Sequence, residues 1–319
     1  MTIHENKRLS DILFYHIGGN ARYILEAKNR DDILKAFAFI KEHNIKKFLV
    51  VALGANLLMQ DEDFLGAIVW INKPDVSEMH IASDGLVEVF AGEILDDLTL
   101  FAFSNHLRGL ESLGGLPSTI GGAIRGNAGA FGVEMKDILE KVEVLDLKDN
   151  QVKELTNEEC QFSYRNSLFK HSNDLVILRG YFRLPSATDD EITKAREVYL
   201  GKIDFRNTNH PVEYPSCGSV FKNITEKEKV EKMLSVWPDM REQVEKKWHN
   251  KVSMGYAIKR LGFSGTQVGG AKITEKHANY ISNVDHAKAA DVLAIIKKIK
   301  QKFQATFGFN PELEAEIVT

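Results

Sequence analysis

Cysteine is scarce in this chain of 319 residues, which contains only Cys160 and Cys217. They form no CxxC pair and neither has histidine partners at zinc-ligand spacing, which argues against a disulfide framework and a structural zinc site. No apolar run reaches the roughly 18 residues that a membrane-spanning helix needs. The N-terminal residues also lack the apolar run of a signal peptide. We therefore expect a cytoplasmic protein without a membrane association or a bound metal.

A concentrated basic surface is also missing. The formal net charge is −4, and lysine and arginine are scattered along the chain. Nucleic-acid partners usually require clustered positive charge, so we expect none. The remaining composition, 44% hydrophobic and 27% charged, is that of an ordinary globular protein. The length allows two or three domains and a core that can bury a large cofactor.

The predicted elements form a small α/β lobe followed by a larger α+β lobe. A helix over 31–44 and short strands at 47–52 and 67–72 belong to the first lobe. Strands at 86–92, 141–147 and 175–184 and a helix near 95–105 belong to the second. Near the end, Asp285 can cap a helix that stops at Gly308.

Two segments have the glycine content of a phosphate-binding turn. Residues 109–132, GLESLGGLPSTIGGAIRGNAGAFG, contain eight glycines in 24 residues. Glycine lets backbone amides approach a ligand, and a run of exposed amides can hold a pyrophosphate. The segment matches neither GxGxxG after a strand nor a P-loop, so a purely structural loop is an equal interpretation. LGANLL (53–58) follows a predicted strand and is a weaker candidate of the same kind.

Four further segments place polar residues in turns, and each has a structural interpretation when taken alone. They are YRNSLFK (164–170), YPSCGSVFKN (214–223), VGGAKITEKHANYISN (268–283) and PELEAEIV (311–318). The serine of the second segment is not in a GxSxG motif and no triad order is visible, so a hydrolase has little support.

Together the six segments resemble the UDP-N-acetylenolpyruvoylglucosamine reductase family in identity, order and spacing. That family has IGG near the start, G-x-N-L-L, GIPGSVGGA…NAGAYG, YRxSxFK, PSxGSxFKN, GGAxxxEKHANxIxN and FG…LExEV, and the matches run from about residue 17 to 317. The resemblance implies an α+β fold of the vanillyl-alcohol-oxidase type. Two lobes, 1–73 and 74–208, would hold FAD. A third, α/β domain, 209–308, would bind the substrate, with 309–319 returning to the active site.

The resemblance also implies a reaction in peptidoglycan precursor synthesis. NADPH reduces FAD, and the enolpyruvyl double bond of UDP-N-acetylglucosamine enolpyruvate is then reduced to give UDP-N-acetylmuramate. By match to the family motifs, Ser219 protonates the substrate, while Arg165 and Glu316 stabilise the charge on its carboxylate. The expected protein is a monomer that binds a UDP-sugar.

Binding residues follow from the same match. Those expected at FAD are Gly54, Ala55, Asn56, Leu57, Pro117, Ser118, Gly121, Gly122, Asn127, Ala128 and Arg206. Those expected at the substrate are Lys222, Asn223 and Lys272.

The sequence departs from the family pattern at several positions. The turn ALGANLL lacks a glycine and a serine of GxGSNLL, His16 replaces an arginine, and Ile224 replaces a proline. Ser264 stands where a lysine is usual, and the replacement cations that we consider are Lys259, Arg260 and Lys272. Arg165 and Ser219 are 54 positions apart, which predicts the family class without an extra substrate-covering segment.

An insertion occupies residues 225–252, directly after FKN, and is helical in character with a break at Pro238. A solvated surface hairpin is the simpler interpretation, and a lid over the substrate diphosphate is the alternative. Two other functions are alternatives for the whole chain. An FAD oxidase of the same fold would lack GSxFKN and LExE, and an inactive binding protein would not need to keep Ser219, Arg165 and Glu316.

Overall fold

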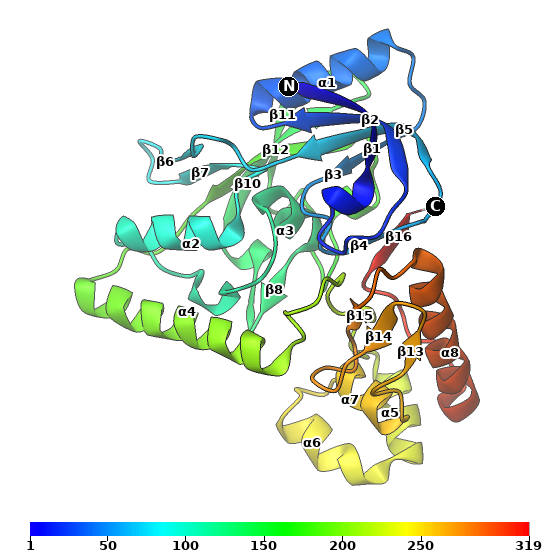
Figure 1. The fold of residues 1–319 in the computed structure, drawn as a ribbon. Coiled ribbons are helices and arrows are strands. Elements are labelled where there is room, and N and C mark those ends of the chain that lie inside the picture. The colour runs from blue at the N-terminus through cyan, green and yellow to red at the C-terminus, as the bar shows by residue number, and fades with distance from the viewer. Residues whose placement is uncertain (319) are drawn as a thin grey trace. The chain divides into compact units, whose positions relative to one another are not determined.

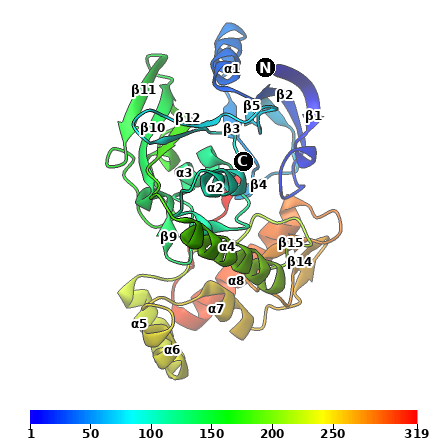
Figure 2. The same cartoon turned by 90° about the vertical axis from the view of Figure 1, so that its left-hand side faces the viewer.

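The computed structural model describes residues 1–318, which form two compact units. The first unit consists of residues 1–7, 21–53 and 64–206, and the second of residues 8–20, 54–63 and 207 onward. Figures 1 and 2 show the elements of both units. Residues 8–20 and 54–63 fall in the predicted first lobe but belong to the second unit. The finer division into two FAD lobes and a substrate domain stays a prediction.

The first unit contains a sheet with strand order β1-β2-β5-β3. Its strands are β1 (Thr2–Arg8), β2 (Asn20–Ala27), β5 (Phe64–Ile71) and β3 (Phe48–Val51), and β5 runs parallel to both β2 and β3. Helix α1 (Arg30–Glu42) begins where the Asn29 side chain accepts a hydrogen bond from the Asp32 amide at 2.8 Å. The helix buries Ile33, Ala36, Phe37 and Ile40 at helical spacing.

A second sheet of the first unit has strand order β11-β10-β12-β7-β6, and all its pairs are antiparallel. The strands are β11 (Gln151–Thr156), β10 (Leu139–Asp146), β12 (Leu175–Phe182), β7 (Val87–Phe90) and β6 (Met79–Ile81). The helices of this part are α2 (Leu95–Ser104), α3 (Ile120–Gly126) and α4 (Asp189–Asn209), and β8 (Gly129–Ala130) pairs with β9 (Val133–Glu134).

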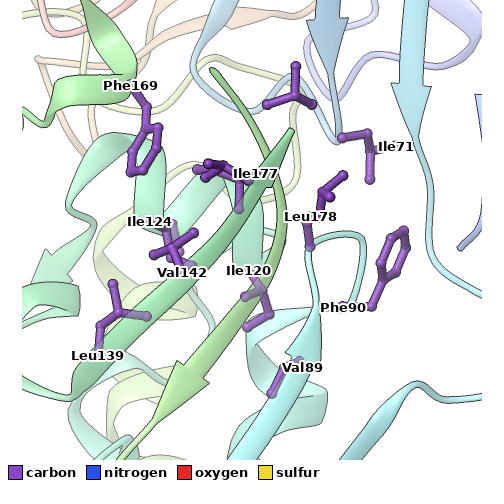
Figure 3. Packing of buried hydrophobic residues seen from close by; sticks show 14 of the residues in the cluster. Ile71, Val89, Phe90, Ile120, Ile124, Leu139, Val142, Phe169, Ile177 and Leu178 are labelled. Carbon is purple, nitrogen blue, oxygen red and sulfur yellow. The ribbon is translucent and has the colours of Figure 1, made fainter. Parts of the chain in front are cut away.

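Helix α3 packs directly on the second sheet, as Figure 3 shows for Ile120 and Ile124 beside Val142 and Ile177. Gly180 of β12 makes this close approach possible, because a Cβ there would lie 2.8 Å from Ile124 Cδ1. The short helix lies within the glycine-rich segment 109–132, so this packing fixes where that segment lies.

The second unit is built around a small antiparallel sheet of β13 (Gln267–Val268), β14 (Ala271–Ile273) and β15 (Ile281–Asn283). In addition, β16 (Glu316–Val318) pairs in parallel with β4 (Leu57–Met59). Helices α7 (Met254–Arg260) and α8 (Ala289–Phe307) complete the fold, and α8 ends at Gly308 with φ 76°. Short 3-10 turns occur at 9–11, 111–113, 135–137, 168–170 and 238–240. No helix among residues 1–318 combines the length and the apolar character needed to cross a bilayer.

The insertion is part of the core of the second unit. It forms α5 (Lys227–Val236), a 3-10 turn and α6 (Arg241–Lys246), and it buries Val230, Met233, Leu234, Met240 and Val244. The Trp237 ring meets Phe307 of α8 edge-on with centroids 4.8 Å apart. Arg260 donates to Asp239 at 2.7 and 2.9 Å and lies 4.6 Å from the Trp237 ring. The segment is therefore packed through one face, and the surface-hairpin and lid interpretations both stay predictions.

Most strands and helices that the sequence predicts are present within a few residues of the expected ends. Helix α8 begins at Ala289 rather than directly after Asp285, and the amide of Lys288, at the N-cap position, donates to Asp291 Oδ2 at 3.0 Å. The sequence interpretation missed the N-terminal strands β1 and β2 and the long, largely exposed helix α4. Helix α4 lacks a broad apolar stripe, since Ile192, Ala195 and Tyr199 are its only buried hydrophobic side chains.

Candidate active site

Ser219 lies in an extended segment that is flanked by two distant parts of the chain. Ser219 pairs with Tyr280 on one side, and Phe221 pairs with Leu313 on the other, both antiparallel. Gly218 precedes the serine with φ 72°, a conformation that glycine adopts without strain. Three of the segments that the sequence singles out, 214–223, 268–283 and 311–318, therefore meet at Ser219 in the second unit.

The main chain next to Ser219 changes partner at Val220. The Val220 amide donates to the carbonyl oxygen of Asn279 at 2.9 Å. The Val220 carbonyl accepts from the amide of Glu314 at 2.8 Å. Val220 and Phe221 are each only 1% exposed, so these bonds are shielded from water and hold the segment firmly.

Glu316 is the first residue of β16 and adjoins the 54–57 turn. Its amide donates to the carbonyl oxygen of Asn56 at 2.9 Å, and Glu316 lies opposite Leu57 in the ladder. The side chain of Asn56 in turn donates from Nδ2 to the carbonyl oxygen of Glu314 at 3.0 Å. Because the Glu314 amide also donates to the carbonyl oxygen of Val220, the second unit places the predicted cofactor turn, Glu316 and the residue after Ser219 in one hydrogen-bonded set.

Two of the three predicted substrate residues have side-chain partners within the second unit. Lys222 Nζ lies 3.4 Å from Glu312 Oε2, and Asn223 Oδ1 accepts from the Met254 amide at 3.0 Å, at the start of α7. Lys272 is half-buried on β14, opposite Ser282 of β15. Of the cations considered as a replacement for the family lysine, Arg260 is already paired with Asp239.

Burial shapes the protonation of the groups beside Ser219. It raises the pKa of the Tyr15 hydroxyl well above its ordinary value and that of the Cys217 thiol to about 12. It lowers the pKa of the His277 imidazole, whose ring stands edge-on to His210 and Tyr280 at 5.0 and 4.9 Å. Tyr15, Cys217 and His277 are therefore neutral at pH 7.

In the first unit, Arg165 lies in a turn with φ 54°. Its Nη2 donates to the carbonyl oxygen of Gly129 at 2.8 Å, and its Cζ lies 5.3 Å from the Tyr164 ring. Gly129 belongs to the glycine-rich segment, so the arginine is anchored on the element that the sequence assigns to the cofactor.

Asn127 fastens the same two segments together. It is fully buried and left-handed, with φ 42°. Its Nδ2 donates to the carbonyl oxygen of Ser163 at 3.0 Å and to Glu134 Oε2 at 2.9 Å, while its Oδ1 accepts from the Lys136 amide at 3.1 Å. The carboxamide therefore already has its hydrogen-bond partners within the protein. Ala128, the next predicted cofactor residue, directly precedes β8.

The turn before α3 presents unengaged backbone amides. Ile120 and Gly121 donate to the carbonyl oxygens of Glu93 and Ala91, each at 2.8 Å, which ties the turn to the end of β7. The amides of Ser118 and Thr119, which follow Pro117, have no acceptor among residues 1–318. Thr119 Oγ1 accepts from the Gly122 amide at 3.2 Å and caps the helix.

The 54–57 turn has the same property. Among the described residues, the amides of Ala55 and Asn56 donate to no acceptor, whereas the Leu57 amide closes the turn on the Gly54 carbonyl at 3.0 Å. Gly54 has φ 68°, and a Cβ there would lie 2.6 Å from Leu13 Cδ2. Amides that are exposed in this way suit an anionic ligand such as a pyrophosphate.

Arg206, the last predicted cofactor residue, is 8% exposed at the end of α4 (Figure 2). Its Nε donates to the carbonyl oxygen of Gly114 at 2.9 Å, and the Gly115 amide donates to Asp96 Oδ1 at 3.0 Å. Burial raises the pKa of the Asp96 carboxyl. Arg206 therefore supports the backbone of the glycine-rich segment at Gly114, within the first unit.

The sequence analysis did not single out Asn279 or Asn127 as supports of the catalytic candidates. Asn279 appeared only as one letter of the polar segment 268–283, and Asn127 only as a cofactor residue. The side-chain contacts that give both residues their roles join segments far apart in sequence, and no local pattern indicates them.

The comparisons with known proteins agree with this geometry. Residues 210–318 match the C-terminal domain model of UDP-N-acetylenolpyruvoylglucosamine reductase, and residues 21–156 match an FAD binding domain. The reductase of Carboxydothermus hydrogenoformans is 32% identical over 314 residues, which are 98% of this chain and 93% of the relative. That of Anoxybacillus flavithermus is 31% identical over 99% of this chain and 94% of its own. The crystal structure of the Thermus caldophilus reductase matches all of both chains with 26% identity and a TM-score of 0.75.

Proposed function

The chain belongs to the UDP-N-acetylenolpyruvoylglucosamine reductase family, and from this premise we propose how its own residues carry out the reaction. It is a flavin-dependent oxidoreductase that uses FAD and NADPH to reduce UDP-N-acetylglucosamine enolpyruvate to UDP-N-acetylmuramate. The predicted family, α+β fold class, enzyme class and cofactors are confirmed by the same matches. The residue roles below are the proposal.

The two glycine-rich turns fit FAD. The unengaged amides at 55–56 and 118–119 offer hydrogen bonds to an anionic pyrophosphate without any lysine, and the Gly121–Gly122 pair keeps the surface next to them free of side chains. Leu57 and Pro117 bound the turns, and Arg206 and Asn127 hold the surrounding backbone. When bound, FAD takes up two electrons from NADPH and passes them to the enolpyruvyl double bond.

Arg165 and Glu316 stabilise the substrate while its double bond is reduced. The reduction builds negative charge on the carboxylate of the enolpyruvyl group, which becomes a doubly charged and strongly basic enolate. A guanidinium at Arg165 and a hydrogen-bonding carboxyl group at Glu316 lower the energy of that charge most if they are already held in place. The bonds from Arg165 to Gly129 and from Glu316 to Asn56 supply this preorganisation.

Ser219 then donates a proton to the substrate carbon. A serine hydroxyl is a weak acid, but it is adequate against an enolate of this basicity. The observation that carries the assignment is that the C-terminal segment 312–316 contains Glu316 and, through the Glu314 amide, also bonds the carbonyl oxygen of Val220, the residue that follows Ser219. The two side chains are thereby held by a common backbone.

Lys222, Asn223 and Lys272 are proposed to lie along the UDP portion of the substrate. Lys272 is the replacement cation favoured for the family lysine at Ser264, because it is half-buried and Arg260 is already paired. A role in peptidoglycan synthesis, a monomeric state and a cytoplasmic location stay predictions.

An anaerobic titration tests the proposed function. Purified protein supplied with FAD should become yellow, NADPH should bleach the flavin, and the enolpyruvyl substrate should restore the colour. A yellow protein that NADPH bleaches but the enolpyruvyl substrate leaves bleached would be an oxidoreductase of another kind. A colourless, folded protein that takes up no flavin would contradict the proposal altogether.

A further inference from the structure

Asn279 completes the hydrogen bonding of the segment that carries Ser219. Its carbonyl oxygen accepts from the Val220 amide at 2.9 Å. Its side chain then bonds both main-chain groups of Phe221, with Oδ1 accepting from the amide at 3.0 Å and Nδ2 donating to the carbonyl at 2.8 Å. One residue therefore makes three hydrogen bonds to the two residues that follow Ser219.

The reason for this arrangement lies in the change of partner at Val220. Beyond that point the segment has left the strand that contains Tyr280 and pairs with the C-terminal segment through Phe221 and Leu313. The Phe221 amide and carbonyl would be left without a partner on the Tyr280 side. The Asn279 carboxamide takes the place of the missing strand, because a primary amide offers one donor and one acceptor at the spacing of a peptide group.

Few other side chains could replace it. Asn279 is 3% exposed and Phe221 is 1% exposed, so water cannot take over the two bonds. Aspartate would keep an acceptor for the amide but would place a second oxygen against the Phe221 carbonyl. Alanine would leave both main-chain groups buried and unpaired.

Asn279 is itself held in place by the turn that contains it. Its amide donates to Nδ1 of His277 at 3.3 Å, and the Tyr280 amide donates to the His277 carbonyl at 3.0 Å. The imidazole sits against Gly255 of α7, where a Cβ would lie 2.9 Å from His277 Cε1. The support of the carboxamide therefore reaches from α7 to the residue next to Ser219.

We propose that Asn279 is a positioning residue that fixes the register of Ser219, so that the serine hydroxyl meets the reduced substrate in the geometry needed for proton donation. The proposal rests on the proposed role of Ser219. Asn279 needs no contact with substrate or cofactor for this purpose, because it acts through the backbone of Val220 and Phe221.

A matched control lies four residues further along the chain. Asn283 is also a buried carboxamide, 9% exposed. Its Nδ2 donates to the carbonyl oxygen of Tyr15 at 3.2 Å, and its Oδ1 accepts from the Ala287 amide at 2.8 Å. Its Nδ2 also donates to the carbonyl oxygen of His16 at 3.4 Å, so the side chain makes three internal bonds, one more than that of Asn279, and none of them reaches the Ser219 segment. The Asn283 amide, which donates to the Pro215 carbonyl at 2.8 Å, is kept in an alanine variant.

The experiment compares Asn279→Ala with Asn283→Ala in FAD-loaded protein. Stopped-flow measurements follow bleaching by NADPH and re-oxidation by UDP-N-acetylglucosamine enolpyruvate separately. We expect Asn279→Ala to slow re-oxidation roughly 10- to 100-fold, because a small misplacement of a reacting group has effects of this size. Its solvent deuterium isotope effect on re-oxidation should rise, since proton transfer becomes slower. Bleaching by NADPH should stay within about twofold of wild type. Asn283→Ala should leave both half-reactions unchanged, although it lowers the melting temperature.

A double-mutant cycle separates positioning from general loss of structure. If Asn279 acts through Ser219, the Ser219→Ala/Asn279→Ala variant should re-oxidise no more slowly than Ser219→Ala alone. Should Asn279→Ala fail to fold, Asn279→Asp keeps the side-chain volume and should show the same selective loss.

Three outcomes would overturn the proposal. They are an Asn279 variant that re-oxidises at the wild-type rate, equal slowing of both half-reactions, and Asn279 and Asn283 variants that behave alike. Full activity of Ser219→Ala would instead refute the assigned role of the serine and remove the premise, which distinguishes that failure from the others.

Discussion

The two units hold their candidate catalytic side chains differently, although each relies on a buried asparagine. In the first unit, Asn127 fastens the turn that contains Arg165, and its partners lie at most 36 positions away in sequence. Asn127, Phe131 and Arg165 all adopt left-handed backbone conformations, with φ of 42°, 51° and 54°. In the second unit, Asn279 reaches across 58 positions to Phe221, and Asn56 across 258 positions to Glu314.

This contrast separates two ways of making a site. A site made of tight turns is partly visible in sequence, because glycine and asparagine are favoured at positions with positive φ, as at Asn127, although Phe131 and Arg165 adopt the same conformation. A site made of extended segments from distant parts of the chain is held by backbone bonds that any residue can form. Its few specific side chains carry no local pattern. Substitutions in the first and second units test how far the two differ.

The largest effect is expected in the second unit, at Ser219. Ser219→Ala removes the proposed proton donor, and we expect re-oxidation of the flavin by the enolpyruvyl substrate to slow by about 10²–10⁴-fold. Bleaching by NADPH should remain near the wild-type rate, because the serine acts only after the substrate has been reduced. Stopped-flow on both half-reactions checks this, and equal losses in both would make Ser219 a structural residue.

Arg165 of the first unit and Glu316 of the second should have smaller effects of similar size. Arg165→Ala and Glu316→Gln each remove one stabilising group, which we expect to slow re-oxidation by about 10²–10³-fold. Similar losses would show that both units contribute to charge stabilisation despite their different construction. A variant that re-oxidises at the wild-type rate would take its residue out of the mechanism.

The insertion tests whether the second unit depends on its remote segments for stability. Leu234 of α5 is 2% exposed, and Leu234→Ala should lower the free energy of unfolding by about 2–5 kcal/mol, measured in urea. Val236, 44% exposed on the same helix, is the control, and Val236→Ala should change little. If Leu234→Ala lowered the free energy of unfolding by less than about 1 kcal/mol, its effect would approach that of a surface substitution. The segment would then be only loosely attached, which would favour a lid.

In the first unit, Asn127→Gly keeps the left-handed backbone but leaves the Ser163 carbonyl and the Lys136 amide without their partner. We expect a loss of about 1–3 kcal/mol in the free energy of unfolding and weaker flavin retention on gel filtration. Asn150, exposed with φ 59°, is a control for the backbone conformation alone. If Asn127→Gly is as harmless as Asn150→Gly, the carboxamide bonds do not hold the turn.

The smallest effect concerns the pH dependence that His277 gives to the second unit. Burial lowers the pKa of its imidazole in the folded protein, whereas the unfolded chain titrates near its ordinary value of about 6.5. Above both pKa values neither state is protonated, so stability is unaffected there. As pH falls below about 6.5, the unfolded state takes up a proton that the folded state does not, and stability is lost at up to about 1.4 kcal/mol per pH unit until the folded pKa is reached.

Urea unfolding between pH 8 and 5, compared with His277→Gln, measures this term. The variant should lose less stability on acidification than the wild type. Parallel curves of unfolding free energy against pH for the two proteins would mean that His277 has the same pKa in the folded and unfolded states.

Sequence by itself determined the fold class and the family, and it indicated the two candidate cofactor turns. Strands such as 47–52 and 175–184 are predicted by short runs that contain β-branched residues. The turns at 54–57 and 117–128 are indicated by glycines, which allow positive φ at Gly54 and close backbone approach at Gly121. The order and spacing of six motifs over nearly the whole chain identified the family, because motif identity is a property of the chain alone.

Tertiary structure alone decided what supports the chemistry. Strands β1 and β2 and the exposed helix α4 lack a strong apolar period, so packing rather than pattern establishes them. Packing also establishes the insertion. Its sequence is rich in charged residues, yet one row of its side chains is buried, and Trp237 contacts Phe307 of α8. Asn279 is the clearest case. Its role depends on a strand that changes partners at Val220 and leaves two buried main-chain groups to be satisfied from 58 positions away. That need arises only once the segments have come together, because hydrogen-bond satisfaction is a property of the packed chain and not of its order.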